Sequence, residues 1–388
     1  MSRLAELIEQ LCPDGVEYRA LGDVAELKRG EAVTRKEVVE GQVPVIAGGR
    51  EPAYYIDRSN RQGETIVIAG SGAYAGFVSF WDEPIFVSDA FSIVVDRSVL
   101  QPRFVYHWLS GRQEAIHALK SGGGVPHVYP KDVAKLRCPV PPLEVQREIV
   151  RILDQFTTLE AELEAELEAR RTQYAHYRTH LLSYESLAAR GPVNVIELRD
   201  VGVVRMCKRI HKAETSIQGD IPFFKISTFG GTPTSFISAE LYGKYKEKYP
   251  YPKKGDLLIS AAGTIGQIVR FDGADAYFQD SNIVWLEHDE SIVLNRYLYY
   301  VYLNTRWTTD GGTIKRLYNN RILQQQICVP PIETQIAIAD LLDRFDALVN
   351  DISSGLPAEI AARRAQYEHY RDRLLSFPDK VVSRSNAS

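Results

Sequence analysis

Residues Cys138 to Asp154 read CPVPPLEVQREIVRILD, and residues Cys328 to Asp343 read CVPPIETQIAIADLLD. A second pair of similar segments follows at nearly the same offset, because RRTQYAHYRTHLLSY at Arg170 to Tyr184 matches RRAQYEHYRDRLLSF at Arg363 to Phe377. Such a long period excludes a solenoid, whose repeats span about 20 to 50 residues. The sequence therefore predicts a tandem duplication.

Each repeated segment has the pattern of a long amphipathic helix. After Pro142 the first copy contains no glycine or proline until Gly191, and apolar residues recur every three or four positions. A helix with one apolar stripe needs a partner, so we expect antiparallel coiled-coil helices at residues 143–184 and 332–377. We expect a break or kink at Gly355-Leu356-Pro357, because proline suits the first turn of a restarted helix.

The segments that precede the two helices differ from each other but share a strand-rich pattern. The first contains VPVIAGG, ETIVIAG, GFVSFW and FSIVV, and the second contains IPFFKIS, DLLISAAG, QIVRF and NIVWL. Each also has a short helical stretch, so we expect two tandem α+β domains at residues 16–142 and 185–331. An N-terminal helix at residues 1–15 and a tail at residues 378–388 complete the organisation, and antiparallel pairing of the helices implies an approximate twofold axis.

A dimerisation coiled coil is the alternative interpretation of the two helical segments. That alternative does not explain why each helix carries a different globular segment, whereas two domains that recognise different targets would share a frame and differ in their loops.

Composition narrows the class of protein. The chain has 388 residues, a net charge of −4 and four widely separated cysteines without a CxxC pair, which fits a reducing cytoplasm. It has no apolar run of 18 residues and no signal-peptide pattern at the start, so we expect no membrane segment. Basic residues concentrate at residues 205–254, where ten Lys and Arg oppose four Asp and Glu.

Catalytic motifs are not evident in the sequence. There is no P-loop, and GSGAYAG at Gly70 runs into a strand pattern and not into a helix, so we interpret it as a turn. Three evenly spaced histidines and a nuclease-like trio do not form a convincing active site; these residues are His107, His117, His127, Asp23, Glu26 and Lys28. We expect no metal site and no cofactor in this chain, and an enzyme with an unrecognised site remains an alternative.

Loops in both domains combine small, aromatic and basic residues that suit DNA. Lys and Arg neutralise phosphates, whereas Arg, Asn and Gln can form bidentate contacts with base edges. The candidate DNA-binding residues of the first domain are Arg50, Tyr54, Tyr55, Arg58, Arg61, Ser71, Tyr74, Lys120, His127, Tyr129 and Lys131. Those of the second domain are Lys208, Arg209, Lys212, Lys244, Lys246, Lys248, Thr264, Lys315, Arg316, Asn319, Asn320 and Arg321. For each, an ordinary surface side chain is the alternative.

The repeated helices, with PPLEVQREIVRILD and RRTQY and their second copies, closely resemble the conserved regions of type I restriction-modification specificity subunits. The segments PAYY, GETIVIAGSGAYAGFVSFWDEPIFVSDAFS and GGGVPHVYPKD resemble the target recognition domains of the same family. The resemblance covers nearly the whole chain.

The resemblance implies a non-catalytic subunit that binds a bipartite double-stranded DNA site. It also implies two methyltransferase subunits that carry S-adenosylmethionine and two motor-nuclease subunits that use ATP and Mg. The family places the methyltransferase contacts in the helical segments 143–182 and 331–375. The candidate partner-binding residues are Gln146, Ile149, Leu153, Arg170, Arg171, Tyr174, Gln335, Ile338, Leu342, Arg363, Arg364 and Tyr367. A stand-alone DNA-binding or scaffold protein without a methyltransferase partner is the alternative function.

Overall fold

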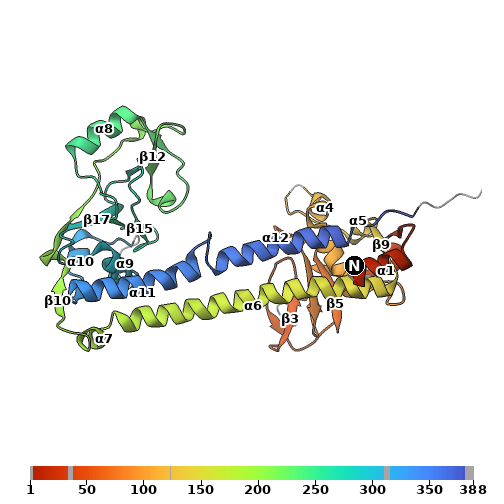
Figure 1. Cartoon of the computed structure of the whole chain (residues 1–388). Helices are drawn as coiled ribbons and strands as arrows, with labels where there is room; N and C mark the ends of the chain where they lie inside the picture. The colour runs from red at the N-terminus through yellow and green to blue at the C-terminus, as the bar shows by residue number, and fades with distance from the viewer. Residues whose placement is uncertain (1–2, 34–37, 123, 310–314, 381–388) are drawn as a thin grey trace, which may run out of the picture. The chain divides into compact units, whose positions relative to one another are not determined.

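A computed structural model of the chain describes residues 3–33, 38–122, 124–309 and 315–380. The chain forms two compact units (Figure 1). The first unit comprises Met1–Ala165 and Glu359–Ser388, and the second comprises Glu166–Ala358. The first unit is therefore assembled from two segments that lie far apart in the sequence.

Three sheets form the globular part of the first unit. The largest is antiparallel, with the order β2-β8-β5-β6: β2 (Ala25–Arg29), β8 (Ala90–Val95), β5 (Glu64–Ala69) and β6 (Val78–Asp82). The second has the order β4-β3-β7: β4 (Tyr55–Ile56), β3 (Val43–Ile46) and β7 (Phe86–Val87), with β7 parallel to β3. The third pairs β1 (Glu17–Ala20) with β9 (Arg137–Val140).

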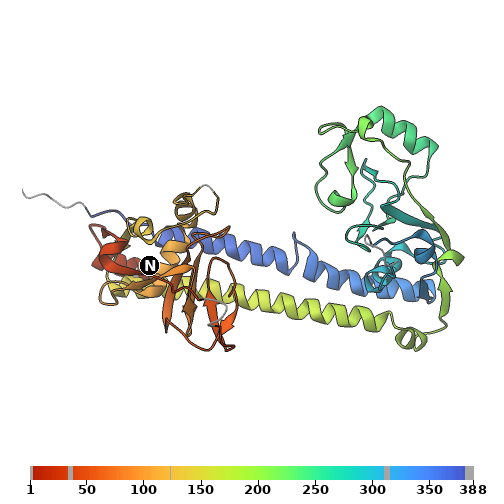
Figure 2. The same ribbon diagram turned by 180° about the vertical axis from the view of Figure 1, so that it is seen from behind.

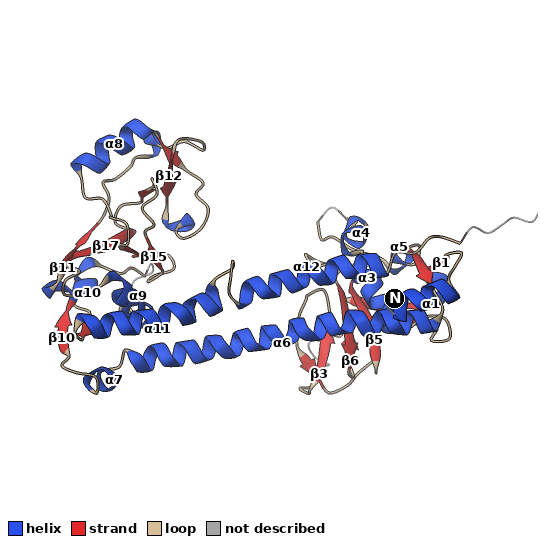
Figure 3. Ribbon diagram, viewed as in Figure 1, coloured by secondary structure: helices blue, strands red, loops and turns tan. Residues whose placement is uncertain are grey.

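The second unit repeats this topology strand for strand. Its four-stranded sheet has the order β11-β17-β14-β15: β11 (Gly202–Arg205), β17 (Ile283–His288), β14 (Leu257–Ser260) and β15 (Ile268–Arg270). Its three-stranded sheet has the order β13-β12-β16: β13 (Phe236–Ile237), β12 (Ile221–Phe224) and β16 (Tyr277–Phe278). Finally, β10 (Asn194–Glu197) pairs with β18 (Gln326–Val329). The duplication expected from the sequence is thus confirmed in the fold, and the domains are α+β (Figure 3).

Short helices complete both domains. The first unit contains α1 (Arg3–Leu11), α2 (Leu21–Val24), α3 (Pro102–Ser110), α4 (Gln113–Ala118) and α5 (Pro130–Val133). The second contains α7 (Tyr184–Ala188), α8 (Ala239–Lys248), α9 (Asn295–Asn304), α10 (Asn319–Leu323) and the 3-10 turns η1 (Leu198–Asp200), η2 (Lys212–Glu214) and η3 (Ile226–Thr228). In the first core, apolar side chains of α3 such as Trp108 and Phe104 pack with those of β5 and β8, including Ile66 and Phe91.

The long helices lie within the segments 143–184 and 332–377 that the sequence predicts, and the second segment is interrupted at residues 351–355. Helix α6 (Leu143–Leu181) is continuous over 39 residues, whereas α11 (Ile332–Asn350) ends before α12 (Leu356–Leu374) begins (Figure 2). Within the first unit α6 and α12 are antiparallel, because Phe156 stacks on Tyr370 while Glu160, one turn later, pairs with Arg364. Within the second unit the last part of α6 packs on α11, where Tyr174 and Tyr177 stack on Phe345.

A seam joins the two segments of the first unit beside α1. The Val16 amide donates to Pro378 O at 2.9 Å, and the Lys380 amide donates to Val16 O at 2.9 Å. The Tyr18 hydroxyl also donates to Phe377 O at 3.0 Å. Residues that follow α12 therefore complete the domain that begins with β1.

No helix among the described residues is long and apolar enough to cross a membrane.

Candidate nucleic-acid interface

Each unit has an open pocket at the same place in its sheets. The first, of about 360 Å³, lies between the end of β2, the turn from β7 to β8 and the segment before α5. The second, of about 490 Å³, lies between the segment after β11, the turn from β16 to β17 and the segment before α10. The backbone frames agree, because the Val128 amide donates to Gly70 O at 3.0 Å and the Leu317 amide donates to Ala261 O at 2.9 Å. The two copies thus offer one frame with two different linings.

Aromatic and polar side chains line the first pocket. The rings of His127 and Tyr129 stack with 6.0 Å between centroids, and Lys131 lies 5.7 Å from the Tyr129 ring. The Ser71 hydroxyl donates a short hydrogen bond to the carboxylate of Asp89, which is exposed in the turn from β7 to β8. A base edge that entered this pocket would therefore meet a stacked aromatic pair and a carboxylate acceptor.

The second pocket is basic. Arg209, Lys212, Lys225 and Arg316 line it, against the single carboxylate of Asp280. The Arg209 Nε donates to Asp280 Oδ2 at 2.8 Å, and Arg316 donates to the carbonyl oxygen of Ser281 at 2.7 Å. Ser281 has a φ of 59°, in the left-handed region that non-glycine residues rarely adopt, so the turn is held in an uncommon conformation by its neighbours.

Helix α8 adds a basic surface to the second unit that has no counterpart in the first, where only Asp57–Gly63 separate β4 from β5. Lys208 and Lys248 lie 5.2 Å and 5.8 Å from the ring of Tyr249. Lys246 is bound inside its own domain, because its Nζ donates to the Tyr242 hydroxyl at 2.7 Å and pairs with Asp275 at 3.3 Å. Lys208, Lys244 and Lys248 are exposed on this surface too, beside the exposed Glu247.

The other predicted DNA residues are distributed around the pockets. Arg50 lies 5.0 Å from the ring of the exposed Tyr74, and the Arg58 guanidinium lies 5.7 Å from the ring of Phe86. Tyr54 and Tyr55 are exposed where β4 begins. The remaining candidates lie on the segment before α5, in the loop after β14, or in and just before α10; they are Lys120, Thr264, Lys315, Asn319, Asn320 and Arg321.

Two of the predicted DNA-binding residues make hydrogen bonds within the first domain. The half-buried Arg61 donates to Ser92 Oγ at 2.7 Å, to the carbonyl oxygen of Asn60 at 2.7 Å and to that of Arg29 at 2.9 Å, which ties its guanidinium to its own sheet. Ser71 is only 9% exposed, and its hydroxyl is committed to Asp89. Both side chains are therefore engaged within the first domain, and their contact with DNA stays a prediction.

Sequence reasoning missed several polar pocket residues, among them Arg29, Asp89, Lys225, Gln279 and Asp280. A signal was present for two of them, because an aspartate follows an aromatic strand in both copies, in FVSD at Phe86 to Asp89 and in YFQD at Tyr277 to Asp280. The two strands are equivalent, since β7 pairs with β3 as β16 pairs with β12. Asp89 and Asp280 are thus the same position of the duplicated domain.

A buried glutamine fastens each long helix to its own domain. The Gln146 side chain, with no exposed surface, donates to Val99 O and Pro141 O and accepts from the Gln101 amide, all at 2.8 Å. Gln335 repeats all three bonds at 2.9 Å with Ile292 O, Pro330 O and the Leu294 amide. The repeated glutamine after the double proline is therefore a structural clamp.

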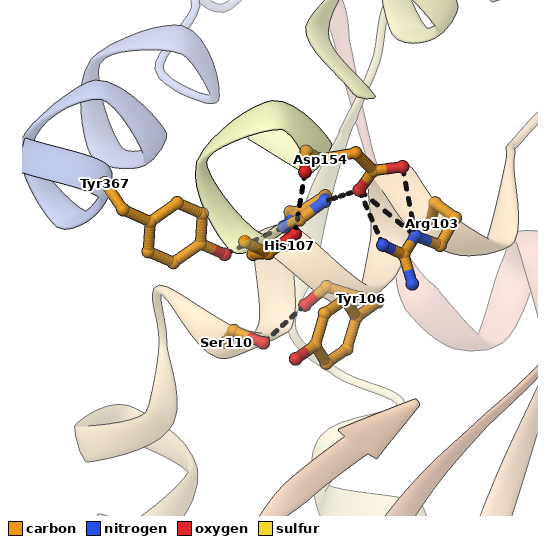
Figure 4. Close-up of polar contacts among 7 residues, drawn as sticks. Arg103, Tyr106, His107, Ser110, Asp154 and Tyr367 are labelled. Atoms are coloured by element: carbon orange, nitrogen blue, oxygen red, sulfur yellow. Dashed lines mark hydrogen bonds and ion pairs between the residues drawn. The ribbon is translucent and has the colours of Figure 1, made fainter. Parts of the chain in front are cut away.

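A polar cluster joins α3, α6 and α12 within the first unit (Figure 4). The buried His107 uses both ring nitrogens, Nε2 with Asp154 at 2.7 Å and Nδ1 with the Tyr367 hydroxyl at 2.8 Å. Arg103 donates to the same carboxylate at 2.8 Å. Burial lowers the pKa of His107 below 6.5, so the ring is neutral at pH 7. Its Nδ1 then accepts the hydrogen bond that the Tyr367 hydroxyl donates.

The second unit has an equivalent of this cluster. Tyr300 takes the place of His107 and donates to Asp343, and Arg296 takes the place of Arg103 and donates to the same carboxylate. In both copies a carboxylate of the long helix is held by two side chains of the short helix beside it.

Eight of the predicted partner-binding residues have side chains engaged within their own units, and their contact with partners stays a prediction. Seven are buried in the cores or clamps of their own units, and Tyr367 is committed to His107; the seven are Gln146, Ile149, Leu153, Tyr174, Gln335, Ile338 and Leu342. Arg364 is exposed but pairs across the helices with Glu160 and Glu164. Arg170, Arg171 and Arg363 have side chains at the helix surface, and their contact with partners stays a prediction.

Within the ranges that the structure describes, no three His, Cys, Asp or Glu side chains gather as metal ligands. All four cysteines are free, and burial raises the pKa of Cys138 and Cys207 to about 12, so neither is a thiolate at neutral pH.

Comparison with known proteins identifies the class. A family model described as the type I restriction modification DNA specificity domain matches residues 13–169 and again residues 191–362, so the chain belongs to this family. It is 41% identical to a putative type I restriction enzyme specificity subunit of Haemophilus influenzae, over 93% of this chain and 96% of the relative. A type I restriction enzyme specificity subunit of Escherichia coli is 31% identical, over 71% of each chain. With both domain copies present, the chain is a specificity subunit of a type I restriction-modification system.

Solved structures agree on the fold. The S subunit of a type I restriction-modification system from M. genitalium aligns with a TM-score of 0.58 at 18% identity, over 93% of this chain and 96% of that one. A chain from a study of complex assembly and conformational transition of the type I R-M system aligns with a TM-score of 0.57 at 19% identity, over 94% and 98%. The two-domain fold with long helices is therefore the fold of this family.

Proposed function

We propose that the chain reads a two-part DNA site, with one pocket for each part, and that it holds methyltransferase and motor-nuclease subunits over that site. The observation that carries the proposal is the pair of equivalent pockets in one backbone frame with different linings. Two readers of different base sequences need this combination, because base readout depends on side chains while the frame fixes their position.

The charges of the second unit support contact with a phosphate backbone. Four cations line its pocket, and exposed lysines of α8 extend the basic surface. The aromatic rings of the first pocket suit a base, and Lys131, which lies beside the Tyr129 ring, suits a phosphate.

The long helices support the docking of partners. Leu159 on α6 and Leu348 on α11 occupy equivalent positions and are 45% and 40% exposed, and Leu341, two turns before Leu348, is 40% exposed as well. Exposed apolar side chains at equivalent positions suit a partner that binds twice through the same surface.

A domain exchange tests the two-reader proposal. Residues 16–140 are replaced by the matching domain of a relative with a known site, and the chain is reconstituted with methyltransferase subunits of its restriction-modification system. Methylation mapping should then show one half-site changed and the other retained. A change in both half-sites would refute separate readers, and failure of the unaltered chain to direct methylation would favour a stand-alone scaffold.

A further inference from the structure

We infer that Arg209, held by Asp280, reads a guanine in the half-site of the second unit. The inference rests on the proposed function and assigns a base and an atom pair to one position of the second pocket.

The geometry of the Arg209–Asp280 pair leaves the two Nη groups of Arg209 available for a further contact. Its Nε donates to Asp280 Oδ2 at 2.8 Å, and the carboxylate is 15% exposed whereas the arginine side chain is 64% exposed. No other hydrogen bond of Arg209 is present among the residues that the structure describes. Both Nη groups are therefore directed away from the bond that fixes the side chain, and they form the planar fork that matches guanine O6 and N7.

The carboxylate orients the arginine in advance. A free arginine loses side-chain entropy when it binds, and a bond at Nε removes part of that loss before DNA arrives. The Asp280 carboxylate would repel the phosphates of a DNA bound at this pocket. Its presence among the cations there, Arg209, Lys212, Lys225 and Arg316, therefore needs a reason. Holding the arginine toward a base supplies that reason, because a phosphate contact needs no such orientation.

The first unit differs at the same place. In both units the first strand of the four-stranded sheet follows a turn of similar sequence, LGDV before Ala25 and LRDV before Gly202, so the same count along the chain puts Ala32 where the second unit has Arg209. Asp89, the equivalent of Asp280, accepts from Ser71 and from no arginine among the described residues. The paired Nη groups of an arginine held by an aspartate are thus a feature of the second domain alone. We therefore expect the preference for guanine in one half-site only.

The test uses the full chain reconstituted with its methyltransferase subunits and duplexes that carry the mapped site. One guanine of the second half-site should be essential: replacing it with 7-deazaguanine, which lacks the N7 acceptor, should lower methylation about 5- to 150-fold, the range of a bidentate contact. Arg209→Ala should methylate duplexes with guanine and with 7-deazaguanine at that position equally well, and its base preference at every other position should be unchanged. Asp280→Asn should reduce the ratio of methylation on guanine to methylation on 7-deazaguanine at that position and leave the other positions unchanged. A merely structural role of Asp280 would not have this effect.

Lys212→Ala is the matched control, because it removes a cation of the same pocket whose ammonium has no carboxylate partner in the part of the chain that the structure describes. It should weaken all sequences alike and reduce the salt dependence. Retained guanine discrimination in Arg209→Ala, or a uniform loss like that of Lys212→Ala, overturns the inference while the proposed function stands. If the unaltered complex shows no sequence preference in either half-site, the proposed function itself fails.

Discussion

Tyr367→Phe should destabilise the first unit, because it removes one hydroxyl from the cluster of Figure 4. That hydroxyl donates to Nδ1 of His107 at 2.8 Å, and His107 has no exposed surface from which water could replace the bond. A buried acceptor left without a donor costs about 1–3 kcal/mol. For a unit of this size the melting temperature falls by roughly 2–4 °C per kcal/mol, so we expect a loss of about 2–12 °C.

Hydrogen exchange followed by mass spectrometry assigns the loss to a unit. In Tyr367→Phe the exchange of α3, the middle of α12 and the start of α6 should accelerate, since these three elements meet at His107. The matched control is Tyr300→Phe, which removes a hydroxyl from the equivalent cluster, where Asp343 keeps its bonds to Arg296. That variant should lose about 0.5–1.5 kcal/mol, with faster exchange in α9 and α11. If Tyr367→Phe leaves the first unit as stable as before, the hydroxyl is not the buried donor that the structure indicates.

Three further outcomes are expected. Burial lowers the pKa of His107 below 6.5, so the imidazole binds a proton more readily in the unfolded chain than in the folded one. The stability of the first unit is therefore fully present above pH 6.5 and declines as the pH falls toward the folded-state pKa. Denaturant titrations across this range should show a decline that His107→Gln lacks. Gln335→Leu should leave two buried carbonyl oxygens and one amide without hydrogen-bond partners, at a cost of about 1–3 kcal/mol each, and hydrogen exchange in α11 should become faster. Gln326→Leu, at an exposed position of β18, should leave exchange in α11 unchanged. Replacing Lys208, Lys244 and Lys248 with alanine should weaken specific and random duplex alike and lower the slope of log K against log salt by about 0.9 for each phosphate that is no longer neutralised; an unchanged slope would make them ordinary surface charges.

The sequence was sufficient for the elements and their duplication. Helix periodicity and the double prolines placed α6 and α11, and Ser353 to Pro357 marked the break between α11 and α12. β-Branched and aromatic runs placed the main strands, because strand patterns are local. These features depend on residues close together in the chain.

Other features depend on contacts between distant residues, and the sequence did not reveal them. Gln146 is polar and repeated, which favoured a surface role, yet its three bonds go to backbone groups that become available only when the domain has folded around it. Asp89 and Asp280 belong to short turns, and only the packing of three sheet segments makes those turns pocket walls. The seam between Val16 and Pro378 joins the far parts of the chain, for which no periodicity gives a signal.

That seam fixes an order of events during translation. Tyr18 must wait for Phe377, its hydrogen-bond partner, which is made 359 residues later. At about 5–20 residues per second the ribosome needs roughly 20–70 s for that stretch. The second unit is one uninterrupted segment, and all of it is synthesised before the residues after α12 that form the seam. The domain that is synthesised first is therefore completed last, and throughout that interval His107 and the edge of β1 lack the partners that α12 and the residues after it will bring.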